Sequence, residues 1–209
     1  MAYPSEPWLL VLHGLRLKGF GEPDDIAAIV GVSAHVVVEN LEKAAADGLV
    51  LRRDSGRLTG WSLTGDGRAE QERLLRAEVA ASGFEPTVRA AYGRFLAMNK
   101  ALLHLCTDWQ MVDETTLNEH DDPAYDAAVI ARLSALHGEL EPILAELEGT
   151  LDRYAGYRAR FAAALEKLGA GDGDWFTKPM IDSYHTVWFQ LHEDLLNTLG
   201  IERAKEATQ

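Results

Sequence analysis

The chain has 209 residues, a single cysteine and a formal net charge of −13 at neutral pH. Its 47% hydrophobic and 25% charged residues are ordinary for a folded globular protein and exclude a disordered or fibrous chain. With Cys106 alone, neither an intrachain disulfide nor a four-cysteine zinc site is possible, which fits a reducing compartment. The longest charge-free stretch, residues 26–38, is too short to cross a bilayer, and residues 1–8 lack the pattern of a signal peptide. We therefore expect a cytoplasmic protein with no membrane partner.

The negative charge is unevenly distributed along the chain. Residues 1–80 carry 9 basic and 12 acidic side chains, a net charge of −3, whereas residues 81–209 carry 11 and 21, a net charge of −10. The negative net charge of the whole chain argues against a protein that coats nucleic acid without sequence preference. It is still compatible with a small module that presents basic groups locally.

Prolines and glycines predict where helices start and end. Proline is tolerated in the first helical turn, and a left-handed glycine commonly closes the last turn. These rules predict helix starts near residues 7, 23, 86, 123, 142 and 179 and helix ends near residues 19, 31, 48, 138, 169 and 200. An apolar stripe from Ile143 to Leu168, with steps of three and four, predicts one continuous helix. Residues 110–122 and 169–177 are polar or glycine-rich and predict loops.

The first 64 residues predict three helices followed by a hairpin. The expected helices span residues 8–18, 24–30 and 34–47, and Ser33 stands at the N-cap of the third after a tight turn. Two short apolar segments between residues 49 and 64 flank an Asp-Ser-Gly turn, which is typical of a β-hairpin. This is the only β structure that the sequence predicts.

The motifs in this region resemble the winged helix of the MarR and PadR families of transcriptional regulators. The resemblance is carried by Gly31-Val32-Ser33, Leu41, Gly48-Leu49-Val50, Arg53-Asp54 and Leu63-Thr64-Gly65-Asp66-Gly67-Arg68. The resemblance covers about the first 80 residues and implies a winged helix-turn-helix with a two-stranded wing in residues 1–80. The apolar patterns of residues 81–209 predict an all-helical bundle for dimerisation and ligand sensing, so we expect a mainly α-helical protein. PadR proteins likewise begin directly with the winged helix and dimerise through the helices that follow. The apolar residues on several faces of 179–199 independently predict a homodimer.

The functional interpretation of the third helix and hairpin is an interface with double-stranded DNA. The helix would enter the major groove, and Asn40 suits a bidentate contact with adenine. Basic side chains of the wing would lie near phosphates, and Arg57 at its tip would enter the minor groove. Glu39 departs from the family, because a carboxylate repels phosphates. The predicted DNA-binding residues are Ser33, His35, Val36, Asn40, Lys43, Arg52, Arg53 and Arg57. The alternative is a winged helix that contacts protein.

Aromatic and histidine residues gather toward the helix ends of the second half and predict a pocket for a small organic ligand. The expected ligand-binding residues are Trp109, His120, Tyr184, His185, Trp188 and His192. The alternative is that these side chains pack a helical core. A metal site from His120, Asp182, His185 and His192 is a further alternative, similar to that of some GntR effector domains, but the spacing lacks their Asp-x-x-x-His pattern. We therefore expect no metal and no cofactor.

No motif in the sequence indicates catalysis. Neither a Gly-x-Ser-x-Gly nucleophile motif nor a phosphate-binding loop is present, so we expect a protein that is not an enzyme. The leading hypothesis is a dimeric DNA-binding regulator that responds to an effector of unknown identity. A second hypothesis is a non-catalytic accessory subunit of a metabolic enzyme, because the overall pattern is similar to a helical region found beside phosphoenolpyruvate- or pyruvate-dikinase-like proteins.

Overall fold

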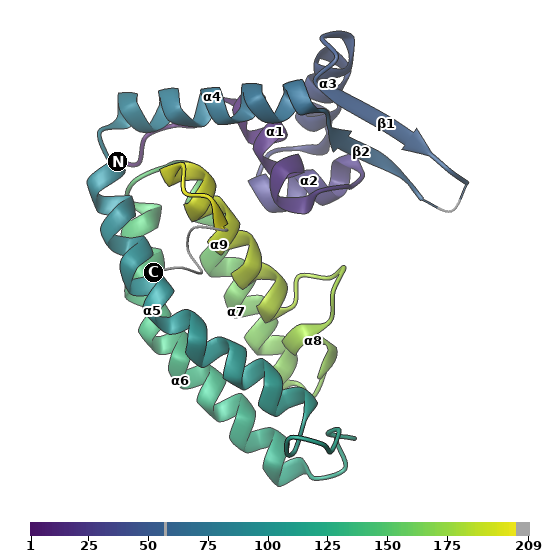
Figure 1. Cartoon of the computed structure of the whole chain (residues 1–209), viewed down its shortest axis with the longest axis vertical. Helices are drawn as coiled ribbons and strands as arrows, with labels where there is room; N and C mark the ends of the chain where they lie inside the picture. The colour runs from purple at the N-terminus through teal and green to yellow at the C-terminus, as the bar shows by residue number, and fades with distance from the viewer. Residues whose placement is uncertain (57, 204–209) are drawn as a thin grey trace. The chain divides into compact units, whose positions relative to one another are not determined.

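The computed structural model describes residues 1–56 and 58–203 and is mainly helical (Figure 1). In this part of the chain, nine α-helices, one 3-10 helix and one two-stranded antiparallel sheet are present. No helix in it has the length and apolar character that a membrane span requires. Two compact units form, and we describe each by itself. The first unit contains Met1–Pro86, Glu148–Gly156 and the C-terminal stretch from His192, and the second contains Thr87–Leu147 and Tyr157–Leu191.

Three short helices form the core of the first unit. Helix α1 spans Pro7–Lys18, α2 spans Pro23–Val30 and α3 spans Ala34–Ala46, close to the predicted bounds. Gly14 allows α1 and α2 to cross closely, because a Cβ there would lie 2.8 Å from Val30 and 2.9 Å from Ile26. The apolar faces of the three helices and the hairpin share one core, made of Val11, Leu12, Leu15, Ile26, Val37, Leu41, Ala44, Val50 and Leu63.

The predicted hairpin is present, and the loop before α2 extends it. Strand β1 (Val50–Asp54) pairs antiparallel with β2 (Thr59–Leu63). Gly21, in the loop between α1 and α2, exchanges two backbone hydrogen bonds with Trp61 on the other side of β2, at 3.1 and 2.8 Å. Gly60 must lack a side chain, since its Cβ would lie 2.8 Å from the ring of Phe20.

Helix α4 (Gly65–Ser82) is joined to the hairpin by a tight backbone contact. The hydroxyl of Thr64 accepts from the amide of Gly67 at 3.0 Å and donates to the carbonyl of Gly48 at 2.9 Å. A Cβ on Gly67 would lie only 1.9 Å from the carbonyl oxygen of Leu49. The motif Leu63-Thr64-Gly65-Asp66-Gly67 therefore has a structural role. Thr64 caps α4, and the missing side chain of Gly67 leaves room for the backbone of Leu49.

A cluster of charged side chains is buried in the first unit. The guanidinium of Arg153 bonds to Glu78 at 3.0 Å and also to Asp194, and all three side chains are at most 5% exposed. The amide of Gln71 lies 3.0 Å from Nδ1 of His13, whose Nε2 lies 3.1 Å from Asp194. Burial alone raises the pKa of the Asp194 carboxyl, but Arg153 and His13 outweigh it and hold this pKa well below its usual range. The cluster ties α1, α4 and α9 (Tyr184–Leu199) together.

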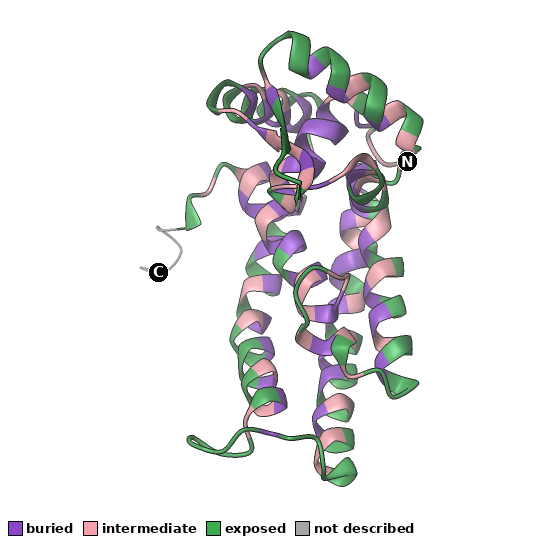
Figure 2. Ribbon diagram, turned by 90° about the vertical axis from the view of Figure 1, so that its right-hand side faces the viewer, coloured by how far each residue is buried: buried purple, intermediate pink, exposed green. Residues whose placement is uncertain are grey.

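The second unit is a bundle with an aromatic core. Helices α5 (Glu85–Gln110) and α6 (Pro123–Glu148) run side by side, as Figures 1 and 2 show, and α7 (Ala155–Gly169) and the first half of α9 complete the bundle. The Phe95 ring stacks on Trp188 with centroids 4.5 Å apart, and Phe161 lies 4.9 Å from Tyr184. Buried positions face the inside of the bundle and exposed ones the outside (Figure 2).

Four local predictions for this half were wrong. The stripe from Ile143 to Leu168 is not one helix. Helix α6 ends at Glu148, Leu151 is extended (φ −118°, ψ 132°) and pairs with Tyr3, and a 3-10 turn precedes α7.

The predicted helix end at Gly138 and helix start at Pro142 both lie inside α6. Burial of the surrounding leucines offsets the backbone hydrogen bond that Pro142 cannot donate. Pro179 does not start a helix, since α9 begins at Tyr184. The predicted loop over residues 169–177 contains a short helix, α8 (Asp174–Thr177).

Candidate functional site

Five of the predicted DNA-binding residues lie on α3 or at its N-cap, and each of them is exposed or partly exposed: Ser33, His35, Val36, Asn40 and Lys43. Ser33 caps the helix, its hydroxyl accepting from the amide of Val36 at 3.3 Å. His35 is exposed, and its Nε2 lies 3.7 Å from the carboxylate of Glu39. The side-chain amide of Asn40 donates to the carbonyl of Val36 at 2.7 Å, so a base contact requires this amide to change rotamer. The start of α3 is therefore polar and exposed but not strongly basic.

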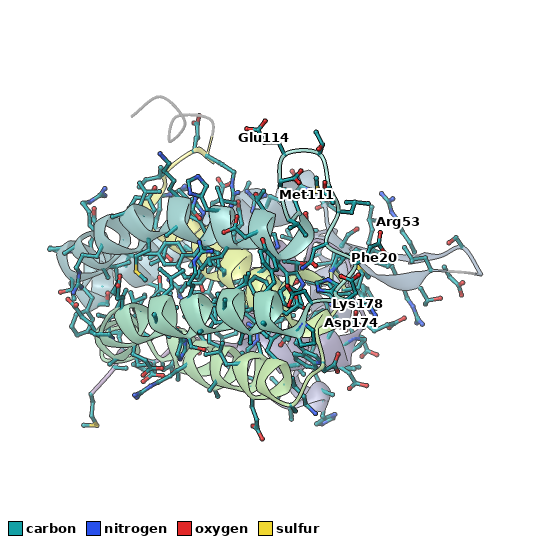
Figure 3. All side chains as sticks on the ribbon, turned by 90° about the horizontal axis from the view of Figure 1, so that it is seen from below. Phe20, Arg53, Met111, Glu114, Asp174 and Lys178 are labelled. Atoms are coloured by element: carbon teal, nitrogen blue, oxygen red, sulfur yellow. The ribbon has the colours of Figure 1, made fainter. Side chains whose placement is uncertain are left out.

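The hairpin supplies most of the positive charge of this surface. Arg52 and Arg53 are exposed on β1, and Lys43 is exposed near the end of α3. The guanidinium of Arg52 lies 5.9 Å from the centroid of the Trp61 ring, and Arg53 projects away from the hairpin (Figure 3). Within residues 1–56 and 58–203, none of the three cations pairs with a carboxylate. Arg57 lies outside the described residues.

The surface formed by α3 and the hairpin is electrically balanced in an acidic protein. Residues 33–58 contain four basic and four acidic side chains, a net charge of zero, whereas the whole chain carries −13. Trp61 and the Gly21 bridge are parts of this surface that the sequence did not predict, because a single bridging residue leaves no alternating pattern. Lys43, Arg52 and Arg53 are thus the exposed cations that the described part of this surface presents.

A second candidate site lies at one end of the helical bundle. A cavity of about 670 Å³ opens between the end of α5, the start of α6, the end of α7 and the segment around α8. Two of the six predicted ligand-binding residues, Trp109 and His120, line it. The sequence missed its other walls, whose side chains come from separate helices without a common motif: Gln110, Pro123, Asp126, Ala127, Ile130, Leu168, Asp172, Asp174, Thr177 and Lys178.

His120 is held at the rim of this cavity in a fixed orientation. Its backbone has φ 60°, an uncommon conformation for a residue other than glycine. Its Nδ1 lies 3.0 and 3.1 Å from the two carboxylate oxygens of Asp126, and the side-chain amide of Asn118 donates to Asp126 at 2.9 Å. The indole of Trp109 contacts His120 and stacks on Phe176, with centroids 4.5 and 4.7 Å away. With Nδ1 directed to the carboxylate, Nε2 is left for another partner.

The other four predicted ligand-binding residues do not join this cavity. Tyr184 and Trp188 are buried in the core of the bundle, where the Trp188 indole donates to Asn99 at 3.0 Å. His185 is partly buried, and burial lowers its pKa. His192 is buried and belongs to the first unit. The structure therefore does not bring the predicted set together, since side chains on one helix face diverge as the helix passes different neighbours.

The residues considered for a metal site are likewise not gathered. Asp182 forms a bidentate ion pair with Arg160, at 2.8 and 2.9 Å, and His120 is engaged with Asp126. Within the described residues, no group of three or more histidine, cysteine, aspartate or glutamate side chains is arranged to hold a metal ion.

Comparisons with known proteins found no match to this chain. No family model, no curated protein and no solved structure matches this chain. The resemblance of residues 1–80 to MarR and PadR regulators therefore stays a prediction. Any functional assignment depends on the two sites described above.

Proposed function

We propose that the protein is a DNA-binding transcriptional regulator, a homodimer that reads double-stranded DNA through a winged helix in its first unit and senses a small organic molecule through its second. The observation that carries the proposal is the arrangement of α1, α2, α3 and the hairpin around one core, with α3 exposed and the hairpin arginines unpaired with carboxylates in the described chain. The Gly21–Trp61 bridge supports it, because it places a short strand segment beside the hairpin.

In this proposal, the start of α3 enters the major groove and the hairpin follows the adjacent backbone. Lys43, Arg52 and Arg53 neutralise phosphates, and the release of counterions from DNA supplies most of the affinity. Asn40 supplies base recognition when its amide leaves the carbonyl of Val36. Because the surface has no net charge, we expect modest affinity that depends strongly on salt.

The test is binding of the full-length chain to promoter fragments, including those beside its own gene, measured by fluorescence anisotropy over a range of salt concentrations. Arg53→Ala should weaken binding and reduce the slope of log affinity against log salt by about 1, because one cation leaves the interface. Arg76→Ala, which removes an exposed arginine of α4, is the matched control and should leave the slope unchanged. Absence of binding to every fragment at low salt would overturn the proposal.

A second candidate function is an accessory subunit that uses the same surface to contact protein. The observation that favours it is the exposure of two leucines on the hairpin, Leu51 at 51% and Leu58 at 56%. Exposed apolar side chains of this kind are more useful at a protein interface than against phosphates. The double variant Leu51→Ser and Leu58→Ser separates the candidates, because it should leave DNA affinity nearly unchanged but weaken a protein contact.

A further inference from the structure

The cavity of the second unit has the size and wall chemistry of a small-molecule site. Its volume of about 670 Å³ falls within the range of pockets that hold ligands of drug size. Ala127 and Ile130 on α6 and Leu168 on α7 form an apolar wall, and Trp109 adds an aromatic edge. A wall of this kind favours a ligand with an apolar body.

The charges that line the cavity are mostly negative. Asp126, Asp172 and Asp174 face a single lysine, Lys178, whose ammonium bonds to Asp174. Figure 3 shows Asp174 and Lys178 beside each other. In the described chain, no cation lies within ion-pair distance of Asp172, although the Lys178 ammonium also interacts electrostatically with its carboxylate. Helices α5 and α7 also end at the cavity, and helix C-termini carry negative partial charge. The site therefore attracts cations and repels anions.

His120 adds a hydrogen-bond acceptor to this negative field. Its Nδ1 faces the carboxylate of Asp126, and the tautomer with the proton on Nδ1 satisfies this contact and leaves a lone pair on Nε2. The buried side chain of Asn118 accepts from the backbone amide of His120 at 3.1 Å and donates to Asp126. These two hydrogen bonds hold His120 and Asp126 in their positions relative to each other. An acceptor beside carboxylates suits a ligand group that donates hydrogen bonds and carries positive charge.

We propose that this cavity binds a small organic amine, with its ammonium group at His120 and Asp172 and its apolar body against Ile130 and Leu168. The proposal names the class of the sensed ligand and in that respect rests on the proposed function. Binding of the amine is nevertheless a separate property of the second unit, and it is measured without DNA.

The test uses three probes of nearly equal shape and different charge: phenethylamine, phenylethanol and phenylacetate. Calorimetric titration of the full-length chain at neutral pH should show the tightest binding for the cationic amine, weaker binding for the neutral alcohol and none for the anion. Binding of the alcohol or the anion at least as tight as that of the amine would overturn the proposal, and so would absence of amine binding.

Variants localise the site. Asp172→Asn removes a charge without breaking a described ion pair and should weaken amine binding about fivefold, the effect of one partly screened charge. Ala127→Trp places a large ring in the cavity and should abolish binding. Glu114→Gln, which removes an exposed carboxylate of the loop before α6 outside the cavity (Figure 3), is the matched control and should bind normally. Normal amine binding by Ala127→Trp would overturn the assignment.

A DNA-binding assay with and without phenethylamine then separates the two proposals. If the amine binds at the cavity and DNA does not bind, the proposed regulator function fails while the amine site stands. If DNA binds and the amine does not, the ligand inference fails while the DNA function stands.

Discussion

The first unit buries charged side chains, whereas the second buries mainly aromatic and aliphatic ones, so we expect the two units to respond differently to mutation. The first unit encloses Arg153, Glu78 and Asp194 and brings backbones into direct contact at Gly67, so its geometry depends on specific pairs. The second unit is packed by aromatic rings and aliphatic side chains, and most of its charged groups lie at the surface or around the cavity. Buried charges must each meet a specific partner and therefore specify one arrangement, whereas apolar side chains in a core can repack after a substitution.

The largest expected effect comes from removing the central cation of the first unit. Arg153→Met leaves Glu78 and Asp194 buried without their partner and should lower the free energy of unfolding by about 3–5 kcal/mol. The measurement is chemical denaturation at neutral pH. Arg158→Met is the control, because its exposed pair with Glu141 should contribute about 1 kcal/mol or less. Equal losses for the two variants would show that the buried cluster has no special role.

The pH dependence of stability should arise mainly from Asp194. Its pKa is lowered in the folded protein, so its contribution is present above the unfolded pKa of about 4 and is lost as the pH falls through the folded pKa. Denaturation of the wild type and of Asp194→Asn from pH 7 to pH 2 should therefore show a stability difference that is constant above about pH 4 and shrinks below it. A difference that grows on acidification contradicts the assignment.

The next effect tests the close backbone contact in the first unit. Gly67→Ala places a methyl group 1.9 Å from the carbonyl oxygen of Leu49 and should lower the free energy of unfolding by about 3 kcal/mol. Gly65→Ala, two residues earlier in the same helix, meets no atom within 4 Å and should be nearly neutral. Thermal denaturation of both variants measures the contrast. Similar melting temperatures for the two would mean that α4 shifts freely.

The smallest effect is expected in the apolar core of the second unit. Tyr184→Phe removes one hydroxyl, which lies 3.2 Å from Nδ1 of His137, and keeps the ring against Phe161. The loss should be about 1 kcal/mol, the usual value of one such hydrogen bond. Urea denaturation measures it. A loss as large as that of Arg153→Met would show that polar contacts specify the second unit as strictly as the first.

The sequence by itself predicted the elements whose signals are local. Proline at the starts of α1 and α2, the Ser33 cap and the glycine ends gave the bounds of three helices and the hairpin to within about two residues, since each signal acts within one turn. It also identified Trp109 and His120 as candidate ligand contacts, and both line the cavity.

Only the tertiary structure decided the features that depend on distant segments. An apolar stripe continues in phase across residues 143–168, but pairing of Leu151 with Tyr3 breaks the helix there. The buried cluster joins residues 13, 78, 153 and 194, which share no motif. The cavity likewise gathers Asp126, Asp172 and Lys178 from separate segments. Periodicity records which face of a helix is apolar, but it carries no information about which distant side chains that face meets.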